Sequence, residues 1–93
     1  EEAESRIIAD KIYKNHYTSR DINNLKALAA KGSLLAQVTL AHCYESGKGF
    51  LVSKSEAVTL YRNAAYRGSK FAAEEVQRLY NEIRPEETLF ELN

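Results

Sequence analysis

The stretch that decides the fold is Ala36–Ala72, AQVTLAHCYESGKGFLVSKSEAVTLYRNAAYRGSKFA, which predicts two helices joined by a loop that contains two glycines. Parts of the same pattern recur on either side of this stretch at one fixed offset. Identical residues stand 36 positions apart in the pairs Ser19 and Ser55, Ala29 and Ala65, Gly32 and Gly68, Ser33 and Ser69, Ala36 and Ala72, and Tyr44 and Tyr80. A fixed period of this length is typical of stacked helical-repeat proteins.

The composition limits the classes of protein to which the chain could belong. Its 93 residues suffice for one domain, and a hydrophobic content of 44% is enough for a folded core. Thirteen basic residues balance thirteen acidic ones, so the net charge of zero provides no basic field for nucleic acid or an anionic membrane. No apolar run approaches the roughly 20 residues of a membrane-spanning helix, which argues against direct membrane insertion. Cys43 is the single cysteine and excludes an internal disulfide.

Apolar residues at helical spacing predict five helices, at about 2–17, 20–31, 34–46, 54–67 and 70–83. The first carries Ile8, Ile12 and His16 on one stripe, which predicts a partly buried histidine. Pro85 is expected to end the fifth helix, and Leu89-Phe90 and Leu92 in the tail to form a C-terminal cap.

Cap residues mark the junctions between these helices. Thr18 with Asp21, or Ser19 alone, can cap the second helix. Ser33 can cap the third helix, and Ser53 with Glu56 has the spacing of a capping box for the fourth. Basic residues precede Gly32 and Gly68, an arrangement typical of a helix end closed by a glycine with positive φ.

Helical periodicity also separates core positions from surface positions. In the third, fourth and fifth helices, the residues expected inward are Ala36, Leu40, Cys43, Tyr44, Ala57, Leu60, Tyr61, Ala64, Ala65, Ala72, Val76, Leu79 and Tyr80. Val38, His42 and Glu45 lie on the opposite side of the third helix at 100° per residue, and Glu74, Arg78 and Asn81 are expected outward on the fifth.

The repeated positions resemble the Sel-like repeat family, which is related to the tetratricopeptide repeats and has a longer loop between its two helices. The matching pattern is Ala36-x3-Leu40-Ala41-x2-Tyr44-x2-Gly47-x-Gly49, followed by Ala57-x3-Tyr61-x2-Ala64-Ala65-x2-Gly68-x3-Ala72. The resemblance implies an all-α fold, a right-handed α-α superhelix or solenoid of about five helices with a C-terminal capping tail. It also implies one domain over 1–93, with a long N-terminal helix and half-unit at about 2–32, a complete unit at about 33–68, and a half-unit and capping tail at about 69–93.

The resemblance has departures and implications of its own. Ser53 stands where the family has Asp or Asn, and Glu56 stands where it has Lys. Gln77, 36 positions after Ala41, replaces the small side chain that the complete unit has at Ala41. The resemblance implies a bacterial origin most often, in envelope, secretion or host-interaction settings. The chain begins with Glu1-Glu2 rather than Met, which indicates a piece of a longer protein or a processed form. The bacterial cytoplasm and a periplasmic or secreted location therefore both remain open.

Two local patterns invite a catalytic or ligand-binding interpretation, and both have a simpler structural one. His42 and Cys43 are adjacent on a helix and point about 100° apart, so they cannot easily meet one substrate or metal ion. Gly47-Lys48-Gly49 lacks the preceding strand and the Lys-Ser/Thr ending of a phosphate loop. We therefore expect no catalytic residue, no metal ligand and no cofactor.

The free positions of the repeat are the better candidates for function. The first helices of successive units line the concave side of such a stack, where relatives bind peptides and protein surfaces. The expected partner-binding residues are Val38, His42, Glu45, Glu74, Arg78 and Asn81, of which the last three follow the first three by 36 positions. The mixed charge of this set favours neither a simple acidic nor a simple basic ligand.

The leading hypothesis is a non-enzymatic module, a scaffold, adaptor or regulator that binds a protein or peptide partner on its concave surface. One alternative is a small inhibitor or immunity-type protein directed at a single enzyme or toxin. Another is an accessory domain of a larger protein whose catalytic part lies elsewhere. Self-association through the ends of the stack is a further expectation, because end faces lack a neighbouring repeat.

Overall fold

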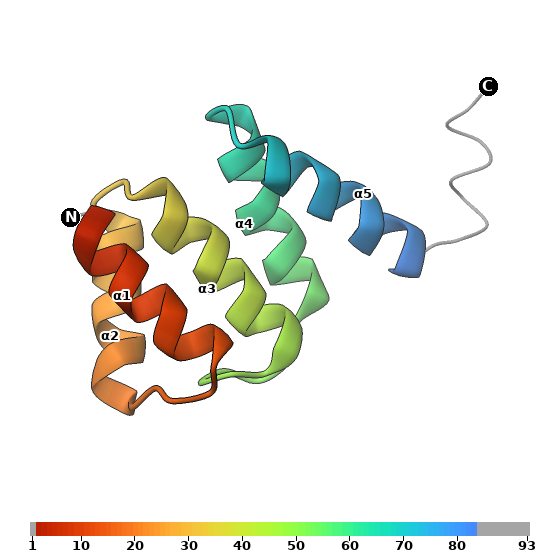
Figure 1. The fold of residues 1–93 in the computed structure, drawn as a ribbon. Coiled ribbons are helices and arrows are strands. Elements are labelled where there is room, and N and C mark those ends of the chain that lie inside the picture. Colours follow the sequence, from red (N-terminus) through yellow and green to blue (C-terminus); the bar gives the residue numbers. More distant parts are fainter. Residues whose placement is uncertain (1, 84–93) are drawn as a thin grey trace, which may run out of the picture.

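The computed structural model describes residues 2–83, and within that range the fold is all-helical, with five helices and no strand (Figure 1). The helices are α1 (Glu2–Tyr13), α2 (Ser19–Ala30), α3 (Leu34–Ser46), α4 (Lys54–Tyr66) and α5 (Lys70–Ile83). Their order and number agree with the expectation from the sequence. The expected cap at Leu89, Phe90 and Leu92 lies outside the described residues.

The first helix is shorter than its periodicity predicts. It ends at Tyr13, and Asn15 adopts a positive φ of 61°, a conformation that asparagine tolerates better than most residues. The turn is closed by the His16 N–H, which donates to the Lys11 carbonyl at 2.8 Å. His16 therefore lies beyond the helix and is exposed, so the expectation of a partly buried histidine is wrong.

Local capping explains where the other helices begin. The Thr18 hydroxyl accepts from the Asp21 N–H at 3.2 Å, and the Asp21 carboxylate accepts from the Thr18 N–H at 3.0 Å. This reciprocal pair makes Thr18, rather than Ser19, the cap of α2. Ser33 and Ser53 cap α3 and α4, because their hydroxyls accept from the third N–H of each helix. The Ser53 N–H donates to the Tyr44 carbonyl at 2.9 Å rather than to Glu56, so the expected capping box is only half formed.

Helix α3 occupies the centre of the fold. It packs against α1, α2 and α4, whereas α5 packs mainly on α4 (Figure 1). One hydrophobic cluster joins α1, α2 and α3 through Ile8, Ile12, Ile22, Leu25, Leu28, Ala29, Ala36, Leu40 and Cys43. A second joins α3, α4 and α5 through Val38, Ala41, Ala57, Val58, Tyr61, Ala64, Ala72 and Leu79.

The loop between α3 and α4 is fixed by packing on the first cluster. Phe50 stacks on Tyr44 with ring centroids 4.3 Å apart. Gly49 has a φ of +82°, and a Cβ there would stand 2.8 Å from Ile22 Cδ1, so this position requires glycine. The Lys48 ammonium donates to the Ile12 carbonyl at 2.9 Å and thereby caps the end of α1. The glycine-lysine-glycine sequence thus has a structural role in this loop.

Candidate functional site

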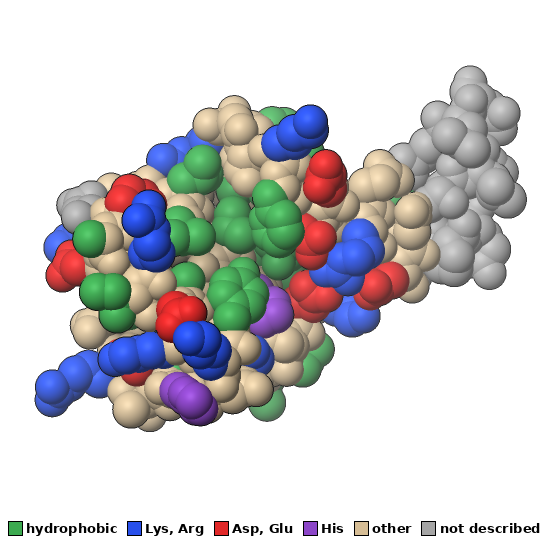
Figure 2. Space-filling model, viewed as in Figure 1, with side chains coloured by type: hydrophobic (Ala, Val, Ile, Leu, Met, Phe, Trp, Pro, Cys, Tyr) green, Lys and Arg blue, Asp and Glu red, His purple; other side chains and the backbone are tan. Residues whose placement is uncertain are grey.

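An apolar groove lies on the face formed by α1, α3 and the start of α5. Its volume is about 560 Å³, and it is lined by Glu2, Tyr13, Leu34, Leu35, Val38, Ser69 and Phe71. Figure 2 shows hydrophobic side chains gathered in the middle of this face, with charged side chains around them. We call this hollow the α1–α3–α5 groove.

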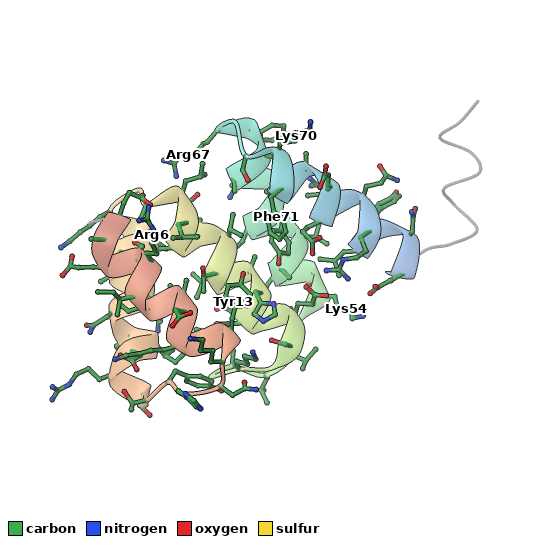
Figure 3. All side chains as sticks on the ribbon, viewed as in Figure 1. Arg6, Tyr13, Lys54, Arg67, Lys70 and Phe71 are labelled. Atoms are coloured by element: carbon green, nitrogen blue, oxygen red, sulfur yellow. The ribbon has the colours of Figure 1, made fainter. Side chains whose placement is uncertain are left out.

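The floor of the groove is aliphatic and its walls are aromatic. Leu34, Leu35 and Val38 come from the first two turns of α3. Tyr13 of α1 and Phe71 of α5 stand on either side, and they are 46% and 49% exposed (Figure 3). Phe71 is held edge-on against Tyr61 of α4, with ring centroids 6.3 Å apart. Both aromatic side chains are open to solvent, and together they offer an apolar contact surface.

The two polar residues of the groove are already engaged in hydrogen bonds. The Ser69 hydroxyl accepts from the Ala72 N–H at 3.0 Å and caps α5. The Glu2 carboxylate accepts from the Ser33 hydroxyl at 3.1 Å, and that hydroxyl also lies 2.7 Å from the buried Ser5 hydroxyl. These bonds leave the apolar side chains as the principal means of holding a ligand in the groove.

His42 lies directly beyond Tyr13. The two rings are 4.6 Å apart and tilted by 37°. The Nε2 atom of His42 is buried and has no hydrogen-bond partner among the described residues. Burial, and secondarily the charge of Lys48, lowers the pKa of His42, so the neutral imidazole is favoured.

An ion cluster centred on Arg78 joins α3, α4 and α5. The guanidinium of Arg78 donates to Glu45 at 2.7 Å, to Glu75 at 2.6 Å and to Glu82 at 2.9 Å. Glu82 in turn pairs with Lys54 at 2.9 Å. Hydrogen bonding to Glu75 and then to Glu45 raises the pKa of Arg78, and hydrogen bonds from Lys54 and Arg78 lower the pKa of Glu82.

The structure separates the residues expected from sequence into different roles. Glu45 and Arg78 form the ion pair between α3 and α5, while Glu74 and Asn81 are exposed on α5. Val38 was expected on the free side of α3, but only 7% of it is exposed. Val38 is buried because α3 is surrounded by three helices, so its side chain joins the second hydrophobic cluster.

Periodicity alone missed the aromatic walls and most of the floor of the groove. A signal for two of these residues is nevertheless present in the sequence. Leu35 and Phe71 are separated by the same 36 positions as the packing residues, and both are bulky and apolar outside the packing pattern. Tyr13 and Leu34 carry no comparable signal, because their place in the groove depends on how the helices pack.

The candidates for chemistry remain apart from one another and from the groove. Cys43 is fully buried in the first cluster, and burial raises the pKa of its thiol to about 11, which disfavours the reactive thiolate. Within residues 2–83, no group of three or more His, Cys, Asp or Glu side chains could hold a metal ion. In the same range, no helix has the length and apolar character needed to cross a membrane.

The described residues form an all-helical protein with an apolar groove on one face. Comparison with protein-family models, with curated proteins and with solved structures gave no match. The resemblance to Sel-like repeats therefore rests on the residues of this chain.

Proposed function

We propose that this protein is a non-enzymatic interaction module, similar to Sel-like repeat proteins, that binds a protein or peptide partner through the α1–α3–α5 groove. The observation that carries the proposal is the groove itself, in which Tyr13 and Phe71 stand half-exposed over an aliphatic floor. Half-exposed aromatic side chains around an apolar depression are typical of protein-binding surfaces.

Equivalent turns support the part of the proposal that concerns a repeated superhelical architecture. Gly32 and Gly68 have φ values of +103° and +106°. The N–H groups of Ser33 and Ser69, one residue further on, donate to the carbonyls of Leu28 and Ala64 at 3.1 and 3.0 Å. Closely similar turns at the 36-residue offset support an architecture of repeated, stacked units.

The surroundings of His42 and Cys43 support a role without catalysis. Cys43 faces the first hydrophobic cluster, whereas the ring of His42 lies against Tyr13. A nucleophile and its base must lie within hydrogen-bond reach of each other, whereas the buried Nε2 atom of His42 has no hydrogen-bond partner among the described residues.

The test is to compare two double variants as bait for partner capture, with mass spectrometry as the readout. Tyr13→Ser with Phe71→Ser removes the walls of the groove, and we expect it to lose partners that the unaltered protein retains. Leu51→Ser with Tyr66→Ser is the matched control, because it removes an aliphatic and an aromatic side chain that are exposed outside the groove. Circular dichroism checks that both variants keep their helical content. Equal capture by the two variants would contradict the proposed binding surface.

A further inference from the structure

The charges around the α1–α3–α5 groove are distributed unevenly. Figure 3 shows Arg6, Arg67 and Lys70 along the upper edge of this face, where α1 and α5 begin. In the part of the chain that the structure describes, no carboxylate forms an ion pair with any of these three side chains. Arg67 is oriented by a 2.6 Å hydrogen bond from its guanidinium to the Gly32 carbonyl.

The carboxylates near the groove offset this positive edge only in part, because the one carboxylate that lines the groove, that of Glu2, faces three cations. Glu2 lines the groove, and its carboxylate accepts a hydrogen bond from Ser33. Glu74 lies one turn after Lys70 along α5, and Glu75 and Glu45 follow in the ion cluster of Arg78. The groove therefore has a basic edge where α1 and α5 begin and an acidic cluster further along α5.

This asymmetry restricts the chemistry of a ligand. The apolar floor and the aromatic walls require a bulky apolar side chain, and a groove of about 560 Å³ has room for one. Acidic groups beside that anchor are attracted to Arg6, Arg67 and Lys70, and they are repelled from the end that carries Glu45, Glu74 and Glu75. Basic groups beside the anchor have the opposite preference.

We infer that the groove takes a peptide segment in which acidic residues stand within three positions of a bulky apolar anchor. The anchor lies between Tyr13 and Phe71, and the acidic residues lie toward Arg6 and Lys70. This inference rests on the proposed function and adds the chemical class of the partner to it.

The experiment measures fluorescence anisotropy of fluorescein-labelled peptides titrated with the full chain. The probes are EEGLFGGS, which has the anchor and the acidic flank, KKGLFGGS, which reverses the flank, and EEGSSGGS, which lacks the anchor. We expect EEGLFGGS to bind at least about fivefold more tightly than KKGLFGGS, and EEGSSGGS to show no saturation up to about 1 mM. The preference for the acidic flank decreases as KCl screens the basic edge.

Two variants locate the site, and a third serves as the control. Phe71→Ala weakens binding of EEGLFGGS about tenfold, because the anchor loses one wall. The double charge reversal Arg6→Glu with Lys70→Glu inverts the preference in favour of KKGLFGGS. The matched reversal Arg20→Glu with Arg62→Glu alters exposed side chains that do not line the groove, and it leaves the preference unchanged.

Three results of the peptide titrations would overturn the inference. They are equal affinity for the acidic and basic probes, an unchanged affinity in the Phe71→Ala variant, and absence of saturable binding by any probe. Sedimentation of the full chain at increasing concentration tests whether a second copy of the chain, rather than a peptide, occupies the groove. A dimer that dissociates on Phe71→Ala would assign the groove to a second copy of the chain and overturn the inference. If the acidic preference is absent but the double variant Tyr13→Ser with Phe71→Ser still loses partner capture, only this inference is rejected. The proposed function then stands.

Discussion

At the scale of single residues, Tyr61 and Tyr66 show how burial determines the contribution of a side chain to the free energy of unfolding. Both belong to α4, but Tyr61 is 1% exposed and Tyr66 is 81% exposed. We expect Tyr61→Ala to lower the free energy of unfolding by about 3–5 kcal/mol, because it leaves a cavity within the second cluster.

The same substitution at Tyr66 is the control, and it should change the free energy by no more than about 0.5 kcal/mol. Urea denaturation followed by circular dichroism measures both values. Similar losses in the two variants would mean that Tyr61 does not hold α4 to α3 and α5 in the way described.

His42 gives stability a dependence on pH. Its pKa is lowered in the folded protein by burial, so the unfolded chain binds a proton more readily. The folded state is therefore favoured most above the unfolded histidine pKa of about 6.5. Stability then decreases as the pH falls from there through the lower folded value.

We expect unfolding free energies measured between pH 7.5 and 5.5 to fall in the unaltered protein, with a slope of at most about 1.4 kcal/mol per pH unit for one proton. His42→Phe removes the titrating group while it keeps a ring against Tyr13, and it should flatten that dependence. His16→Phe is the matched control, since His16 is exposed beyond the end of α1. An equal slope in the His42 variant would exclude His42 as the source.

At the scale of the helices, the two serine caps at the 36-residue offset have different surroundings. Ser69 accepts one hydrogen bond, from the Ala72 N–H at 3.0 Å. Ser33 accepts the equivalent bond at 3.1 Å, and it also contacts the buried Ser5 hydroxyl and the Glu2 carboxylate. Ser33 thus joins α1 to α3 in addition to capping α3.

We expect Ser69→Ala to cost about 1 kcal/mol, the usual value for a lost helix cap. Ser33→Ala should cost about 2–3 kcal/mol, because it also leaves the Ser5 hydroxyl buried without its partner. Thermal and urea denaturation of the two variants provide the comparison. The double variant Ser5→Ala with Ser33→Ala should recover part of the larger loss, and failure to do so would contradict the role of the Ser5 contact.

The helices were predictable because their signals are local. The capping residues, the glycines at 32 and 68 and the apolar spacing lie within a few residues of the features that they determine. The exception was the end of α1, where the apolar stripe continues to His16 although Asn15 closes the turn. A stripe shows where a helix could extend, whereas the backbone conformation at one residue decides where it stops.

The groove was less predictable because it depends on contacts between helices. Val38 lies opposite the packing stripe of α3, yet it is buried because α3 is central. Phe71 falls outside the packing pattern and Tyr13 carries no signal of its own, so their common place in the groove follows only when α1 and α5 are placed on either side of α3. Of the six partner-binding residues expected on the third and fifth helices, Glu45 and Arg78 form an ion pair between these helices.

At the scale of the whole molecule, α3 and α5 have unequal support. Helix α3 contacts α1, α2 and α4, whereas α5 rests mainly on α4 and reaches α3 through the ion pair of Arg78 with Glu45. Elements with fewer buried contacts open at a lower free energy than the global one. The described fold therefore predicts that α5 separates from α4 before α3 unfolds.

Native-state hydrogen exchange tests this order. We expect the amide of Leu79 in α5 to exchange through a sub-global opening, with a lower opening free energy than the amides of Ala41 and Cys43 in α3. Leu79 is as fully buried as these two residues, so the difference would reflect the support of the helix rather than exposure of the site.

Arg78→Gln should lower the opening free energy of α5 further by about 1 kcal/mol, because it removes three ion pairs and leaves their carboxylates close together. The α3 amides should change less, and Arg62→Gln on the exposed side of α4 is the control. Equal opening free energies for α3 and α5 would mean that the molecule unfolds as one cooperative unit, with α5 held as firmly as the centre.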